Sequence, residues 1–264
     1  MNDFFLIDYS NKESKDLFSK YMLENREFIY LKYLEWDTDF FKRPSFSLVI
    51  DKSNFYPNDD LIQVLLNDFK DSFISVKIDT QIDFKYVNFL QESGFSYIDT
   101  EVQLKYREKE ENIHTNEDVK IEKLDVNKNI PHDRLGRSFN LTRFHTDLNI
   151  SNDMANKLWV EYLKNFIPSH NKYLYVAKIN NEVTATALVN IIGDRAYLFF
   201  IAVLEECRSF GIGKQLISNI IADFKGCKIE TGTQVKNTKA LNFYLKNGFF
   251  IKGSSTILHR WNFE

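Results

Sequence analysis

One nine-residue pattern occurs twice in the sequence, once in each half of the chain. Residues 87–95 align without gaps on residues 241–249, and in both copies a helix-like stretch ends at a glycine. A glycine after a helical pattern is typical of a helix C-terminus, where the chain turns through a left-handed conformation. A strand-like segment precedes each copy, at residues 73–79 and 227–233. The repeat therefore predicts a strand–helix–strand unit in each half, although two unrelated corners could also resemble each other by chance.

A charged segment separates the two halves. Residues 107–112 read Arg-Glu-Lys-Glu-Glu-Asn, and the chain stays polar to about Asp118. Such a stretch is typical of a linker or of a surface crossover. We therefore predict two domains, residues 1–110 and residues 118–264.

Composition excludes several classes of function. With 44% apolar and 27% charged residues among 264, the chain resembles an ordinary soluble globular protein. A net charge of −3 gives no reason to expect a nucleic-acid partner. No apolar run approaches the roughly 20 residues that span a bilayer, and two cysteines cannot build a disulfide framework or a four-ligand zinc site. We expect a cytoplasmic protein without membrane insertion or a bound metal; its oligomeric state stays open, with a homodimer as one alternative.

The second half predicts an α/β fold with a mixed sheet and helices on both faces. Three antiparallel strands are expected at residues 173–179, 183–192 and 196–203, with Asn180 and Asn181 as a hairpin turn. Further strands are expected at residues 119–124, 227–233 and 249–261, and helices at residues 131–139, 151–166, 213–224 and 237–246.

The loop after the strand at residues 196–203 carries the strongest chemical signal. Gly211 and Gly213 stand just before a helix, where several backbone N–H groups can converge and the helix dipole adds positive potential. This arrangement predicts an anion site suited to a pyrophosphate. The loop is not a P-loop or a dinucleotide fingerprint, because Arg208 and Leu216 stand where those motifs need glycine. A helix start with glycines for turning is the alternative.

Two motifs in order resemble the GCN5-related N-acetyltransferases (GNAT). Residues 208–213, Arg-Ser-Phe-Gly-Ile-Gly, match the Arg/Gln-x-x-Gly-x-Gly/Ala signature, and residues 237–249 are similar to an Asn-x-x-Ala-x-x-x-Tyr-x-x-x-Gly-Phe block. The resemblance covers residues 119–264. It implies a GNAT fold, acetyl-CoA as co-substrate and N-acetyltransferase activity, with a degenerate GNAT-like half before it.

Three shorter elements resemble the TDP-fucosamine acetyltransferases, which act on dTDP-4-amino-4,6-dideoxygalactose in surface-polysaccharide synthesis. They are residues 36–41, Trp-Asp-Thr-Asp-Phe-Phe; residues 138–144, Ser-Phe-Asn-Leu-Thr-Arg-Phe; and residues 233–241, Thr-Gln-Val-Lys-Asn-Thr-Lys-Ala-Leu. Lys42-Arg43 depart from the pattern, which often has glycine there. The resemblance implies a TDP- or UDP-amino sugar as acceptor. An aminoglycoside, an amino acid or a polyamine is the alternative, as is a non-catalytic acyl-CoA sensor.

The resemblance also implies which residues hold acetyl-CoA. The main chain of Ile201, Ala202 and Val203 would pair with the pantetheine arm, and Asn237 would contact it or cap its own helix. Backbone amides of the loop would bind the pyrophosphate; that loop consists of Arg208, Ser209, Phe210, Gly211, Ile212, Gly213 and Lys214.

Tyr244 would be the general acid, because a phenol can protonate a leaving thiolate. A tyrosine of the core is the alternative. Arg143 could pair with a sugar-nucleotide phosphate, His145 could accept a proton, and Trp36 could contact the acceptor; a solvated loop and core packing are their alternatives. The first half has Leu90 where the second has Tyr244, and is expected to be catalytically inactive. The sequence does not identify the general base or the acyl chain.

Overall fold

The computed structural model describes residues 29–50, 69, 71–81, 85–107 and 116–262. Contacts divide the chain into two compact units, an N-terminal unit of residues 1–100 and 254–264 and a C-terminal unit of residues 101–253. These units do not coincide with residues 1–110 and 118–264, because the end of the chain pairs with a strand of the N-terminal unit. The charged segment at residues 108–115 lies outside the described residues, so its role as a linker stays a prediction.

In its described residues, the N-terminal unit contains a sheet and two helices. Its elements are β1 (Ile29–Tyr33), α2 (Glu35–Phe41), β2 (Ser45–Ile50), β3 (Phe73–Asp79), α4 (Lys85–Glu92) and the end of β10 (Phe249–Trp261). The strand order is β1-β2-β3-β10, with β2 parallel to β3 and the other pairs antiparallel. Leu48, Ile74, Leu90 and Leu258 are buried in its core.

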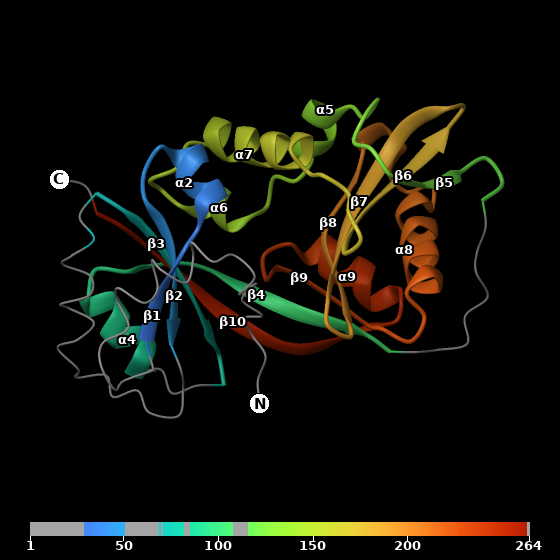
Figure 1. The fold of residues 1–264 in the computed structure, drawn as a ribbon. Helices are drawn as coiled ribbons and strands as arrows, with labels where there is room; N and C mark the ends of the chain where they lie inside the picture. Colours follow the sequence, from blue (N-terminus) through green and yellow to red (C-terminus); the bar gives the residue numbers. More distant parts are fainter. Residues whose placement is uncertain (1–28, 51–68, 70, 82–84, 108–115, 263–264) are drawn as a thin grey trace. The chain divides into compact units, whose positions relative to one another are not determined.

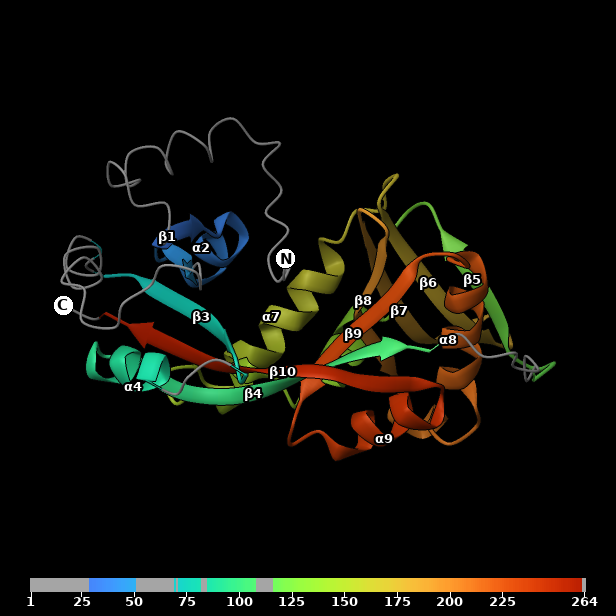
Figure 2. The ribbon, with the colours of Figure 1, turned by 90° about the horizontal axis from the view of Figure 1, so that it is seen from below.

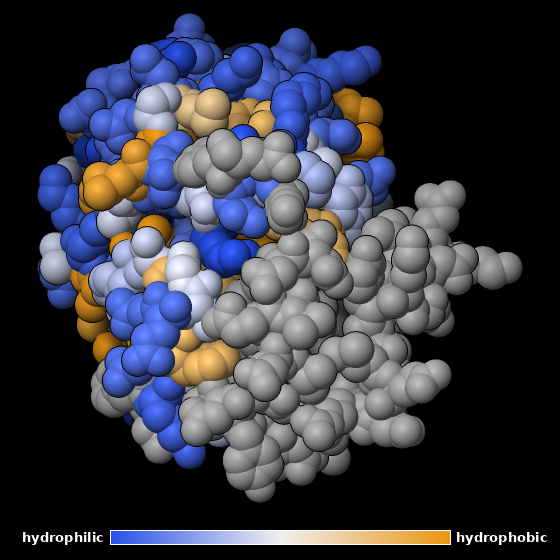
Figure 3. Space-filling view, turned by 90° about the vertical axis from the view of Figure 1, so that its left-hand side faces the viewer, coloured by the Kyte–Doolittle hydropathy of each residue, from blue (hydrophilic) through white to orange (hydrophobic). Residues whose placement is uncertain are grey.

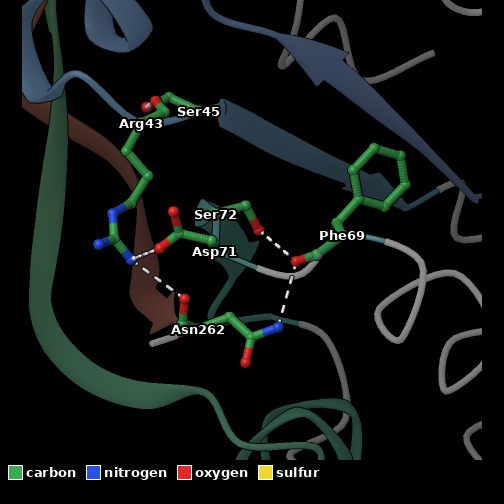
Figure 4. Close-up of polar contacts among 6 residues, drawn as sticks. All are labelled: Arg43, Ser45, Phe69, Asp71, Ser72 and Asn262. Carbon is green, nitrogen blue, oxygen red and sulfur yellow. Dashed lines mark hydrogen bonds and ion pairs between the residues drawn. The ribbon is translucent and has the colours of Figure 1, made fainter. Parts of the chain in front are cut away.

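Arg43 ties the start of β2 to the end of the chain. Its guanidinium donates to the Asn262 carbonyl at 3.0 Å and pairs with the Asp71 carboxylate at 2.8 Å (Figure 4). The Phe69 carbonyl accepts from Ser72 Oγ at 2.7 Å and from Asn262 Nδ2 at 3.2 Å. Arg43, which departs from the family pattern, thus has a structural contact of its own.

The C-terminal unit contains the predicted mixed sheet. Its strands are β4 (Ser96–Tyr106, from residue 101), β5 (Lys120–Leu124), β6 (Lys172–Ile179), β7 (Glu182–Ile192), β8 (Arg195–Val203) and β9 (Lys228–Gln234). They are ordered β4-β9-β8-β7-β6-β5, and only β8 and β9 among these neighbours are parallel. Asn180 and Asn181 both have positive φ, 50° and 64°, which confirms the hairpin turn.

Helices cover both faces of this sheet (Figures 1 and 2). On one face lie α8 (Ile212–Asp223) and α9 (Thr238–Lys246), which share a core with Leu198. On the other lie α5 (His132–Arg137), the short α6 (Arg143–Thr146) and α7 (Asn152–Lys164), whose core includes Phe200. We call these the α8/α9 face and the α5/α7 face. A 3₁₀ turn, η1 (Glu205–Cys207), follows β8.

Both copies of the repeated pattern form the predicted corner. Two residues after the end of α4 lies Gly94 with φ +88°, and two residues after the end of α9 lies Gly248 with φ +84°. Each glycine is followed by a buried phenylalanine, Phe95 or Phe249, at the entrance to a strand. The two halves therefore share a helix–glycine–strand unit.

The described surface shows no large apolar area in the view of Figure 3, where hydrophobic side chains form small groups among hydrophilic ones. Exposed large apolar residues such as Leu148 and Ile167 are scattered along the chain. None of the helices in the described part has the length and the apolar character needed to cross a bilayer.

Candidate active site

Strands β8 and β9 are hydrogen-bonded along only about half of their length. They pair in parallel from Arg195↔Lys228 to Leu198↔Thr231, and no pair follows. On its other side β8 stays paired with β7 as far as Val203. The segment of β8 from residue 199 to residue 203 therefore has an edge towards β9 that β9 does not occupy. An edge of this kind can pair with an extended ligand.

A β-bulge marks the point where the strands part. Leu188 pairs with Phe200 but Val189 pairs with Leu198, so Phe199 is an extra residue in β8. The bulge reverses the alternation of side chains: Leu198 packs on the α8/α9 face, whereas Phe200 packs on the α5/α7 face. Because a bulge bends a strand and increases its twist, it accounts for the separation of β8 from β9.

The predicted pantetheine residues lie on this open segment. Ile201 and Val203 point to the α8/α9 face, and Ala202 is buried on the other face. The Arg208 side chain folds back and donates from Nε to the Val203 carbonyl at 3.1 Å, which ties the loop to the end of the strand.

The glycine loop opens into the N-terminus of α8. Ser209 and Gly211 both have positive φ, 71° and 77°, and Gly211 is the residue that precedes the helix. A Cβ atom on Gly211 would meet no atom within 4 Å, so the space before the helix is open. The first turn of α8 begins with Ile212, Gly213 and Lys214, whose N–H groups have no acceptor within the helix, as an anion site requires.

Gly213 is needed for close packing rather than for an unusual backbone conformation. A Cβ atom there would lie 3.2 Å from the Phe243 ring of α9. The glycine therefore lets α8 start close to α9. The exposed Phe210 and Arg208 lie before it in the same loop.

Asn237 caps α9, which is one of its two predicted roles. Its Oδ1 accepts from the Ala240 N–H at 3.2 Å. The amide nitrogen of the same side chain is the group that could reach a pantetheine, so the contact stays a prediction.

Tyr244 lies on the α8/α9 face beside the point where β8 and β9 part. Its side chain is 4% exposed, and burial raises the pKa of its phenol to about 12, against an opposing hydrogen bond with Thr231. Thr231 is the last residue of β9 paired with β8, and its hydroxyl donates to the Leu198 carbonyl at 2.7 Å. The phenol therefore lies at the apex of the opening, by which we mean the point beside Thr231 where β8 and β9 separate. Its ring also belongs to the core.

Arg143 and His145 lie on α6, a single helical turn in what the sequence predicted as a loop. The His145 ring hydrogen-bonds through Nδ1 to Thr142 Oγ1 at 2.8 Å and through Nε2 to Asn156 Oδ1 at 3.2 Å. Burial lowers the pKa of His145, with Lys236 acting in the same direction. Both nitrogens of this neutral ring are engaged, which favours a structural role over proton transfer.

Lys236 brings the loop before α9 against α6, through its contact with the Thr146 hydroxyl. The Arg143 guanidinium lies 4.6 Å from the centre of the Phe144 ring. The α6 turn thus stands next to the segment that leads into Asn237, and its role in acceptor binding stays a prediction. Trp36 lies in the N-terminal unit, stacked on Phe40 at 5.4 Å, and its role is likewise untested.

Two polar residues that the sequence analysis missed gather at Gly232, the residue after Thr231. A Cβ atom on Gly232 would lie 3.1 Å from the Tyr197 hydroxyl and 3.2 Å from Glu101 Oε1. Glu101 sits on β4, opposite Gln234. The sequence analysis assigned this strand to the other half, so only the symmetry of the repeat could have drawn attention to it.

Cys207 ends the 3₁₀ turn η1, one residue before the glycine loop. Burial raises the pKa of the Cys207 thiol, with Glu206 acting in the same direction, so it stays protonated and a poor nucleophile at neutral pH. Among the described residues, His, Cys, Asp and Glu form no group of three that could hold a metal ion.

Comparison with known proteins gives a family for the part of the chain that holds this site. Residues 141–249 match the model described as "Acetyltransferase (GNAT) family". A crystal structure titled as a GCN5-related N-acetyltransferase from Sphaerobacter thermophilus has a TM-score of 0.62 at 10% identity, covering 89% of this chain and 77% of that one. At such an identity the likeness shows the fold.

Two curated relatives match shorter stretches. The spore coat polysaccharide biosynthesis protein SpsD of Bacillus subtilis (strain 168) is 29% identical over 127 residues, which are 47% of this chain and 44% of SpsD. The 5-NmdU N-acetyltransferase of Pseudomonas phage PaMx11 is 28% identical over 90 residues, 33% of this chain and 64% of the phage protein. The match thus spans less than half of SpsD and less than two thirds of the phage enzyme.

Proposed function

Because residues 141–249 match the model of the GNAT family of acetyltransferases, we propose that the chain transfers an acetyl group from acetyl-CoA to the amino group of a small molecule. The observation that carries this proposal is the parting of β8 and β9 in front of the glycine loop. Along the chain, the open edge of β8 is followed by the glycine loop and then by the N-terminus of α8. Acetyl-CoA has groups in a matching order: an extended pantetheine arm, which could pair with the open edge, and then a pyrophosphate, which could bind at the helix N-terminus.

The residues present fit such a donor substrate. Main-chain groups of residues 199–203 can pair with the pantetheine amides, and the N–H groups of residues 212–214 can bind the pyrophosphate. The open space at Gly211 leaves room for the phosphates. Together these contacts would hold the thioester near Thr231 and Tyr244.

Tyr244 would donate its proton to the leaving sulfur. With a pKa of about 12 the phenol keeps its proton throughout the physiological range. A free thiol has a pKa of about 8.5, so full transfer to a thiolate in water would be uphill by several kcal/mol. Transfer becomes favourable only where burial raises the thiolate's proton affinity too. The phenol is thus expected to act on a sulfur that is shielded from water.

For the acceptor we propose a nucleotide-linked amino-deoxy sugar, such as a TDP- or UDP-amino sugar. Two observations support it: the three sequence elements at residues 36–41, 138–144 and 233–241, and the similarity to SpsD, whose name refers to polysaccharide biosynthesis. This reaction would take place in the cytoplasm. A homodimer is compatible with it but is not required.

Turnover with a panel of amines tests the proposal. The chain is incubated with acetyl-CoA and either dTDP-4-amino-4,6-dideoxygalactose, a UDP-amino sugar, kanamycin, lysine or spermidine, and free thiol is measured. We expect the sugar nucleotides to give the highest kcat/KM. Preference for kanamycin, lysine or spermidine would contradict the sugar assignment. Binding of acetyl-CoA without turnover on any amine would favour an acyl-CoA sensor.

A further inference from the structure

Glu101 and Tyr197 meet over Gly232 within the C-terminal unit. They come from β4 and β8, the two neighbours of β9, and their polar atoms lie 3.2 Å and 3.1 Å from the position a Cβ atom of Gly232 would take. Because Gly232 has no side chain, a carboxylate and a phenol can both reach this point. The glycine thus makes room for a polar cluster inside the sheet.

This cluster flanks the opening between β8 and β9 from the side opposite to Tyr244. Successive residues of a strand point to opposite faces, so Thr231 faces α9 while Gly232 faces α5 and α7. Tyr244 contacts Thr231 from the first face, and Glu101 and Tyr197 cover Gly232 from the second. A thioester held at the apex would therefore have a phenol on one side and a carboxylate with a second phenol on the other.

Glu230 is a second carboxylate on this face, and it lies among cations. Glu230 is 8% exposed and pairs with Lys252 at 2.9 Å and with Arg195 at 3.8 Å. The Glu230 carboxylate is therefore engaged in ion pairs with both cations. Lys105, which is paired with Glu230 across β4 and β9, adds a third positive charge on the same face.

Tyr197 is a neutral hydroxyl at physiological pH. Burial raises its pKa well above the ordinary value, and the negative charge of Glu101 acts in the same direction, with smaller effects from Tyr244 and Glu230. A neutral hydroxyl can accept a hydrogen bond from an ammonium group and donate one to a neighbouring carboxylate.

We propose that Glu101 and Tyr197 form the acceptor-amine subsite, in which Glu101 takes the proton of the incoming ammonium group and Tyr197 orients its nitrogen. This inference rests on the proposed function and adds the base to it. The strand that carries Glu101 precedes the family-matched region, so the first half supplies a group that the second half needs.

The proton balance of the step is complete. An amine of ordinary pKa enters as –NH3⁺ and gives one proton to the Glu101 carboxylate, which passes it to solvent. The freed lone pair attacks the thioester carbon, forming the C–N bond. When the C–S bond breaks, the thiolate takes a proton from the Tyr244 phenol, and the nitrogen's second proton restores that phenol through solvent. The net products are amide, free thiol and one proton.

Glu101→Gln tests the base, because it removes the proton acceptor and keeps the shape of the side chain. Transfer is measured from pH 6 to pH 10 with two acceptors, dTDP-4-amino-4,6-dideoxygalactose and hydroxylamine, which is uncharged at neutral pH. At pH 7 we expect kcat/KM on the sugar to fall by about 10²–10⁴-fold. The loss of kcat/KM on the sugar should become smaller as pH rises, because the amine is then already deprotonated in solution. Turnover of hydroxylamine by Glu101→Gln should stay close to that of the wild type.

Two further variants separate chemistry from folding. Tyr197→Phe is expected to raise KM for the sugar more than it lowers kcat, and Glu122→Gln on the distant strand β5 is expected to change neither. Calorimetry with acetyl-CoA should give the wild-type affinity for all three variants. Equal losses on both acceptors in Glu101→Gln, or an unchanged pH profile, would overturn the subsite. A wild-type chain that transfers acetyl to neither acceptor would overturn the proposed function and the subsite with it.

Discussion

Gly211 and Gly226 are a matched pair of glycines at the two ends of α8. Both have positive φ, 77° and 94°, and a Cβ atom on either would meet nothing within 4 Å. Valine at either site is strained by about 1–3 kcal/mol, so thermal unfolding should shift by similar amounts in the two variants. Only Gly211→Val also places a side chain in the proposed phosphate space. We expect calorimetry to show lost coenzyme A binding in Gly211→Val and wild-type affinity in Gly226→Val; equal affinities would remove this loop from the donor site.

Tyr244→Phe removes one hydroxyl and keeps the ring that packs on Phe249. If the phenol protonates the leaving thiolate, kcat should fall by about 10²–10⁴-fold while acetyl-CoA affinity stays the same. The phenol loses its proton only as pH rises through about 12, so the wild-type rate should show no loss from this group below pH 10. Steady-state rates across that range check both points. A variant with near-normal kcat would leave Tyr244 as a core residue, with water as the proton source.

At the scale of single elements, two variants of Asn237 can distinguish capping of α9 from contact with the substrate. Asn237→Asp keeps the oxygen that accepts from Ala240 and loses the amide donor, whereas Asn237→Ala loses both. We expect Asn237→Ala to cost about 1 kcal/mol of unfolding free energy and Asn237→Asp to cost little. Coenzyme A affinity should fall in both variants if the amide contacts the pantetheine. An affinity that is retained in Asn237→Asp would limit the residue to capping.

The elements that the sequence predicted correctly are those with a local signal. The hairpin at Asn180 and Asn181, the helix after Ser151 and the glycine-terminated α4 and α9 each depend on neighbouring residues. The bulge at Phe199 has no such signal, because it reflects a register set by β7 across the sheet. The same holds for Glu101 and Tyr197, which are adjacent only because β4 and β8 flank β9. The motifs therefore predicted the proposed donor loop, and the pairing between distant strands pointed to the proposed base.

At the scale of the whole molecule, the compact units differ from the predicted domains because strands cross the predicted boundary. Residues 101–105 pair with β9, and Val102 and Leu104 of that segment are buried in the core of the C-terminal unit. Residues 255–261 pair in turn with β3. A charged segment in the sequence indicates a polar stretch of chain. It does not indicate with which strands the preceding strand pairs.

Cleaving the chain at the predicted boundary tests this organisation. A fragment of residues 118–264 lacks Val102 and Leu104, each worth about 1.5–3 kcal/mol of burial, and leaves an edge of β9 without its β4 partner. Total stabilities are about 5–15 kcal/mol, so this loss is a large share of the whole. We expect the fragment alone to aggregate or to lack near-UV circular dichroism, and coexpression with residues 1–117 to restore a folded complex. A fragment that unfolds cooperatively by itself with the near-UV spectrum of the complex would make residues 118–264 an autonomous domain, as the linker predicted.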